Sequence, residues 1–114
     1  MNNFYYNDKK YEEICEEHTY IEMNDEELEY CVEVEKKYYI PKIMQMIKNH
    51  WTLPWIIACI HDLYMDYLIY EDFVFYTELV HIGIKCNTKI IDQGYSIYEN
   101  STDFDFENEN PLRK

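Results

Sequence analysis

The sequence predicts an α+β fold, a mostly helical single domain of about four or five helices with a small C-terminal β-hairpin and a disordered acidic tail. Helical spacing of apolar residues over most of the chain indicates the helices. A Gln-Gly pair between two short apolar segments indicates the hairpin, and the last residues show no periodicity. A chain of 114 residues can bury one core. We therefore expect a compact domain at residues 1–99 and a flexible tail at 100–114.

The first helix is predicted over residues 9–18, after a capping residue at Asn7 or Asp8. Its less polar side chains recur at i, i+3, i+4 and i+7, which is the spacing of one helix face: Tyr11, Ile14, Cys15 and His18. The other face carries four carboxylates: Glu12, Glu13, Glu16 and Glu17. This helix should bury one side and present acidic groups on the other.

Residues 24–39 are compatible with two structures. Apolar and acidic residues alternate over residues 27–35, which is a strand pattern. Against a strand, Asn24 followed by Glu27 resembles a helical capping box, and Lys36 and Lys37 lie where a helix C-terminus favours cations. We adopt the helix and leave the strand open, because either structure places a row of carboxylates on one solvent face.

Further helices are predicted in the middle of the chain. Pro41 suits the first turn of a helix over residues 41–50. Thr52 and Pro54 suit the start of a central helix over residues 52–70, which is apolar nearly all round and should be buried on most sides. A following helix is indicated by a capping Asp72 and by the helical spacing of Thr77, Glu78, His81 and Lys85.

The C-terminal part of the chain changes character. Residues 88–92 and 95–99 are interpreted as two strands joined across Gln93 and Gly94. The segment after Asn100 is polar and has no periodicity, so we expect disorder, or order only on a partner.

Acidic side chains dominate the composition, with 23 Asp and Glu against 10 Lys and Arg and a net charge of −13. Residues 1–35 hold 12 of the acidic side chains and two of the basic ones. Because like charges repel, nucleic acid and anionic membranes are unfavourable partners and a basic protein surface is favoured. Residues 53–60 form the longest uncharged apolar run, too short to span a bilayer, and the start lacks the apolar region of a secretory signal. We expect a cytoplasmic protein.

We expect no cofactor, no metal site and no enzymatic activity. The only candidate zinc ligands have spacings that match no standard site: Cys15 with His18, Cys59 with His61, and His81 with Cys86. Two glycines, Gly83 and Gly94, cannot build a nucleophile elbow, a phosphate loop or a dinucleotide fingerprint. Asp62 and Asp66 share a helix face and could pair in acid-base chemistry, but we interpret them as a solvated stripe.

The acidic face of the first helix has a charge density near that of DNA. Its four carboxylates lie within about 7.5 Å of helix axis at a rise of ~1.5 Å per residue. One charge per roughly 1.9 Å is close to the value of about 1.7 Å for duplex DNA. Further carboxylates could extend this field along a second element: Glu22, Asp25, Glu26, Glu27, Glu29, Glu33 and Glu35. Tyrosines interleave with the acids of residues 1–39, and tyrosine supplies stiff, amphipathic contact area at interfaces. Such a surface could occupy a groove that binds phosphates.

Small size, strong acidity and the lack of a catalytic motif together resemble, as a type and without a shared motif, the DNA-mimic inhibitors that phages make against host nucleases, including anti-CRISPR and anti-restriction proteins. This resemblance implies a protein that binds the basic surface of a nuclease or other nucleic-acid-handling protein and blocks it stoichiometrically. We expect the contact carboxylates to be Glu12, Glu13, Glu16, Glu17, Glu29 and Glu33. The expected aromatic anchors are Tyr30, Tyr38 and Tyr39.

Other functions stay open from the sequence. The same acidic surface would suit an immunity protein or antitoxin that neutralises a basic toxin. A small thiol or metal-dependent enzyme is a second alternative, and its candidate groups are Cys59 and His81. A third is an assembly subunit, a homodimer in which the apolar residues 52–87 pair with a second copy.

Overall fold

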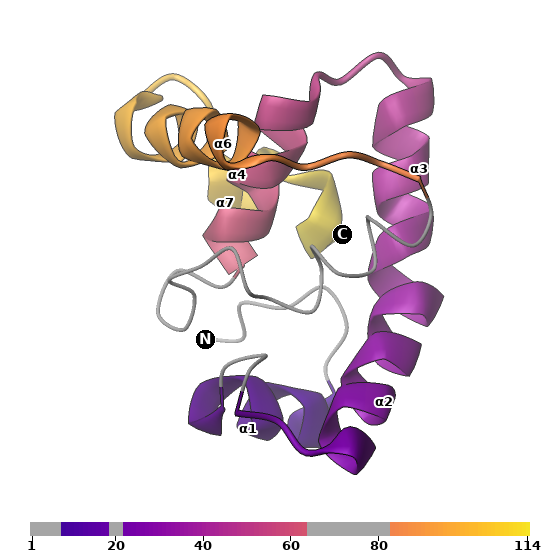
Figure 1. Cartoon of the computed structure of the whole chain (residues 1–114). Coiled ribbons are helices and arrows are strands. Elements are labelled where there is room, and N and C mark those ends of the chain that lie inside the picture. The colour runs from indigo at the N-terminus through magenta and orange to yellow at the C-terminus, as the bar shows by residue number, and fades with distance from the viewer. Residues whose placement is uncertain (1–7, 19–21, 64–82) are drawn as a thin grey trace.

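The computed structural model describes residues 8–18, 22–63 and 83–114 (Figure 1). Its elements are α1 (Lys9–Glu17), α2 (Asp25–Val34), the π-helical segment η1 (Glu35–Tyr39), α3 (Ile40–Lys48), α4 (Leu53–Leu63), α6 (Thr88–Asn100), α7 (Phe106–Glu109) and the 3-10 segment η2 (Pro111–Arg113). No strand occurs in these three ranges. The predicted α+β class is therefore wrong for the described part of the chain, which is mostly helical.

The elements α2, η1 and α3 follow one another without a break and form one long helical column (Figure 1). The predicted helix at residues 24–39 is confirmed. In η1 the Ile40 N–H donates to the Glu35 carbonyl, five residues back. A proline inside an α-helix collides with the carbonyl four residues before it, and this wider turn directly precedes Pro41. The predicted helix at residues 41–50 is therefore present as α3, but it continues the column instead of starting separately.

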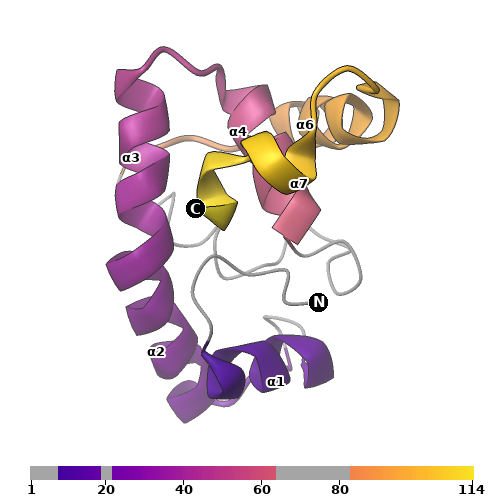
Figure 2. The same cartoon turned by 180° about the vertical axis from the view of Figure 1, so that it is seen from behind.

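The other helices lie along and across this column. α1 crosses one end of it and packs against α2, as both views show (Figures 1 and 2). α4 lies beside the column nearer its other end, and α6 packs mainly on α4. The C-terminal α7 and η2 return to the space between α4 and α3, where η2 contacts both helices.

α4 is the most buried helix of the described chain. Every residue from Ile56 to Leu63 is buried, including His61 and Asp62. Side chains from the column and from the C-terminal segment complete the core around it, among them Tyr39, Ile43, Met46 and Leu112. The expectation that the central helix is buried on most sides is confirmed as far as Leu63.

The predicted β-hairpin is wrong, because residues 88–100 form the helix α6. Asn87 caps it by accepting a hydrogen bond from the Ile90 N–H at 3.0 Å. Gly94 was interpreted as a turn, but it sits inside the helix against α4. A Cβ atom built on Gly94 would lie 2.5 Å from Ile57 Cγ2 and 3.0 Å from the Pro54 carbonyl oxygen. This glycine lets the two helix backbones approach closely.

The prediction of a disordered tail is also wrong, because residues 101–114 contain the short helical turns α7 and η2. Asp105 caps α7 by accepting from the Asn108 N–H at 3.2 Å. Asn110 caps η2, whose first residue is Pro111. Phe106 and Leu112 are buried in the core. These two apolar side chains dock the polar C-terminal segment onto the core.

The remaining helix predictions have mixed outcomes. The helix predicted at residues 9–18 is confirmed as α1. The helix expected after Asp72 falls mostly outside the described residues, and Lys85, its last predicted member, lies in a non-helical stretch. No helix within the described ranges is both long and apolar enough to cross a membrane.

Candidate interaction surface

α1 presents its carboxylates away from the core. Asp8 begins the helix by accepting a hydrogen bond from the Tyr11 N–H at 2.9 Å. Tyr11, Ile14 and Cys15 are buried, so the opposite side faces solvent. The acidic residues of that side are Glu13, Glu16 and Glu17, which are exposed, and Glu12, which is half-buried.

α2 presents a second set of carboxylates. A capping box joins its first turn, in which Asn24 accepts from the Glu27 N–H and Glu27 accepts from the Asn24 N–H. Cys31 and Val34 face the core. The exposed acidic residues of this helix are Asp25, Glu26, Glu29 and Glu33. Glu27 is turned toward α1, where its Oε2 lies 3.5 Å from His18 Nε2.

A buried polar contact fixes α1 against the helical column. The Tyr11 hydroxyl donates to Glu35 Oε2 at 2.9 Å, and both residues are fully buried. The Tyr11 and Tyr39 rings lie 6.0 Å apart. A buried carboxylate needs such a donor, because its desolvation is otherwise costly. This contact holds α1 against η1, the segment that directly continues α2.

The three predicted aromatic anchors lie in different environments. Tyr30 is half-buried between the acidic helices: its hydroxyl donates to Asp8 Oδ2 at 2.7 Å, and the Lys10 ammonium lies 4.3 Å from its ring centre. Tyr38 is half-buried, and Lys37 covers its ring at 5.4 Å. Tyr39 is fully buried in the core and is therefore not part of the exposed surface.

Glu12 differs from the other carboxylates of α1 because it is partly buried and has Glu16 and Asp8 nearby. Burial and the nearby charges of Glu16 and Asp8 raise the pKa of Glu12 above its ordinary value. Its Oε1 is buried and accepts no hydrogen bond from the described residues. The six predicted contact carboxylates thus lie on two helices that contact each other. Five of them are exposed, and Glu12 is half-buried.

The thiols in the described ranges are poorly suited to chemistry. Burial, together with the charge of Asp62, raises the pKa of Cys59 to about 12. Burial is also the main cause that raises the pKa of Cys15, which lies next to Cys31. A thiol that stays protonated at neutral pH is a weak nucleophile. No group of three or more potential metal ligands occurs in the part of the chain that the structure describes.

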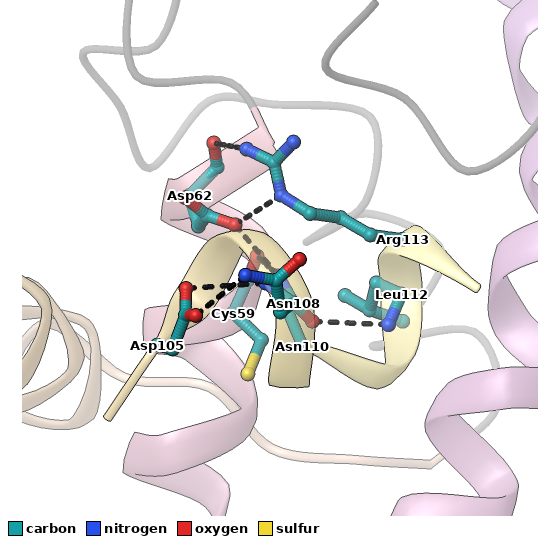
Figure 3. Close-up of polar contacts among 7 residues, drawn as sticks. All are labelled: Cys59, Asp62, Asp105, Asn108, Asn110, Leu112 and Arg113. Atoms are coloured by element: carbon teal, nitrogen blue, oxygen red, sulfur yellow. Dashed lines mark hydrogen bonds and ion pairs between the residues drawn. The ribbon is translucent and has the colours of Figure 1, made fainter. Parts of the chain in front are cut away.

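Asp62 was interpreted as part of a solvated stripe, but it is buried at the centre of a polar network (Figure 3). Arg113 Nε donates to Asp62 Oδ2 at 2.6 Å, and Asn110 Nδ2 donates to the same oxygen at 3.0 Å. Asn110 Nδ2 also lies 3.0 Å from the Cys59 carbonyl oxygen, which accepts from it. Burial lowers the pKa of Arg113, but the hydrogen bond and charge of Asp62 outweigh burial and raise it. This network docks the C-terminal segment onto α4.

Of the three other predicted polar groups of the central region, His61 lies within the described residues and is not part of this network. His61 points to α6 instead: it bonds to the Ile91 backbone and lies edge-on to the Tyr95 ring at 5.4 Å. Asp66 and His81 lie outside the described residues.

Comparison of the chain with protein-family models, with curated proteins and with solved structures gave no match. The function must therefore be argued from the residues themselves.

Proposed function

We propose that the protein binds a basic surface of another protein through the exposed carboxylates of α1 and α2 and competes there with nucleic acid. The supporting observation is that seven acidic side chains are exposed on these two touching helices, against two exposed lysines, Lys9 and Lys10. Carboxylates fixed on packed helices can face the Lys and Arg side chains of a nucleic-acid groove without being cleaved.

The net charge of the whole chain also supports binding to a basic partner. A net charge of −13 on 114 residues attracts a basic partner and repels nucleic acid. Association driven by such a surface is expected to be fast and to weaken with salt, because the Debye length shrinks from roughly 10 Å at 0.1 M to about 3 Å at 1 M.

A protein that neutralises a basic toxin would use the same surface, as an immunity protein or antitoxin does. The two candidates differ in the identity of the partner and not in the chemistry of contact. The thiol-enzyme alternative is weakened by the burial and raised pKa of Cys59.

Capture of the partner tests the proposal. Tagged protein is incubated with lysate of a plausible host, and retained proteins are eluted either with about 0.5 M salt, which shortens the Debye length, or with duplex DNA at low salt. The proposal predicts retention of a basic nucleic-acid-binding protein that both eluents release. Retention that resists both, or no retention at low salt, would contradict it.

A further inference from the structure

A hollow with aromatic walls lies at the corner between α6 and α7, away from the acidic helices. It has a volume of about 480 Å³ and opens broadly to solvent, so it can take a side chain laid against its wall. Six residues line it: Trp55, Asn100, Ser101, Thr102, Asp103 and Phe104. α1 is at the other end of the molecule in both views (Figures 1 and 2), so this hollow is a separate feature from the proposed interaction surface.

The aromatic walls are held by contacts between rings. Phe104 meets Trp55 edge-on at 5.4 Å and Trp51 at 6.0 Å. Phe106 lies 4.7 Å from Phe104 and is stacked on Trp55 at 6.5 Å. Trp55 remains only half-buried although these rings surround it. A fixed, partly exposed indole is a good platform for a flat or cationic group.

The polar side of the hollow is acidic and has hydrogen-bonding groups. Asp103 is exposed and lines the hollow together with Ser101 and Thr102. Asn100 is held by its Nδ2, which donates to the Ser96 carbonyl at 3.0 Å. Residues 88–114 contain six acidic and three basic side chains, and one of the basic groups, Arg113, is paired with Asp62. The charge of this segment therefore favours a cation over an anionic group.

We propose that this hollow binds an arginine side chain of a protein partner, with the guanidinium stacked on Trp55 and paired with Asp103. A guanidinium is planar and weakly hydrated, stacks on aromatic faces and pairs with a carboxylate through two parallel N–H groups. A lysine ammonium fits less well, because it is strongly hydrated and cannot stack. The proposal does not require that the same partner also binds α1 and α2.

A short peptide titration tests this directly. Acetyl-Gly-Arg-Gly-amide is added to ¹⁵N-labelled protein, and the two indole N–H signals are followed by NMR, with Trp51→Phe used to assign them. We expect a saturable shift at the Trp55 indole. The matching citrulline peptide, which has the same shape without the charge, should bind at least ~5-fold more weakly, since a cation over an indole gives about 1 kcal/mol.

Variants of the hollow separate its chemistry from general charge. Asp103→Asn should weaken binding of the arginine peptide about 3-fold, because an exposed ion pair contributes up to ~1 kcal/mol. Glu109 is an exposed carboxylate outside the hollow, so Glu109→Gln should leave the affinity for this peptide unchanged. Unchanged Trp51 signals show that each variant is folded.

Each of the following results would overturn the proposal: a shift that does not saturate, equal binding of the arginine and citrulline peptides, or equal effects of Asp103→Asn and Glu109→Gln. A stronger response to a neutral disaccharide than to arginine would also overturn it and assign the hollow to a sugar. Because no captured partner is used, failure here leaves the proposed role of α1 and α2 unaffected.

Discussion

His61 is a buried histidine that links α4 to α6 and makes folding sensitive to acid. Its exposed fraction is 6%, and burial lowers its pKa to about 4, although the hydrogen bond to the Ile91 backbone opposes this effect. In the unfolded chain a histidine has a pKa of about 6.5. As the pH falls from 6.5 to 4, the unfolded state therefore takes up a proton that the folded state does not.

The free energy of unfolding should fall by about 3 kcal/mol across this pH range through His61, at ~1.4 kcal/mol for each pKa unit. His61→Phe keeps a ring against Tyr95 and removes the titrating group. Urea unfolding at a series of pH values should show that this variant lacks the wild-type loss between pH 6.5 and 4. Parallel pH profiles for the two proteins would show that His61 is not the group responsible.

Arg113 neutralises the buried carboxylate of Asp62, whose side chain is 7% exposed. Arg113→Met should lower the free energy of unfolding by about 3 kcal/mol, because it leaves a buried charge without its ion-pair partner. Adding Asp62→Asn to Arg113→Met should recover part of the loss, since the charge is removed and an acceptor for Asn110 remains. Lys114→Ala, at the exposed neighbouring position, serves as the control in urea unfolding. A stability of Arg113→Met equal to that control would contradict the role given to this pair.

At the scale of elements, the packing of α6 on α4 depends on Gly94. Helix propensity alone predicts that Gly94→Ala stabilises α6 by up to ~1 kcal/mol. The close approach of Ile57 and Pro54 predicts the opposite sign, a destabilisation of about 1–3 kcal/mol from overpacking.

Thermal or urea unfolding of Gly94→Ala decides between the two signs. Gln93→Ala, at an exposed position of the same helix, is the matched control for helix propensity. If Gly94→Ala is as stable as wild type or more so, the two helices are not in close contact at this residue.

The elements that the sequence predicted well are those whose signals are local. The capping box of Asn24 and Glu27 correctly indicated a helix where alternation indicated a strand. The side of α1 that is buried follows directly from the spacing of Tyr11, Ile14 and Cys15.

The hairpin and the tail were predicted wrongly because single residues were given their commonest meaning. Gly94 after Gln93 is typical of a turn, although Ile90, Ile91, Ile97 and Tyr98 have helical spacing around it. In the tail, Asp105 and Asn110 before Pro111 are local capping signals, which the polar composition alone does not reveal. Asp62 could not be predicted as buried, because its partner Arg113 lies 51 residues away in the chain.

At the scale of the whole molecule, the acidic helices lie at one end and share the buried core, to which α1 contributes Tyr11, Ile14 and Cys15. α1 and α2 lie toward one end, whereas α4, α6 and the C-terminal turns lie toward the other (Figure 1). Of the predicted contact residues, the six carboxylates lie on the acidic end, and Tyr39 belongs to the core. That these carboxylates bind a partner stays a prediction, since the sequence supplies their charge and the structure supplies their exposure.

The most direct test of this account is the affinity of the captured partner for two charge-reversed variants. The first variant changes three carboxylates of α1 and α2 to Lys: Glu13, Glu29 and Glu33. The second changes three carboxylates of the C-terminal part to Lys: Asp92, Glu99 and Glu109. All six side chains are exposed, and each variant changes the net charge from −13 by +6 to −7. Calorimetric titration should show at least ~10-fold weaker binding for the first variant, at about 0.5 kcal/mol for each lost contact, and near wild-type binding for the second. Equal weakening of both variants would mean that only net charge matters, and would contradict a specific surface on α1 and α2.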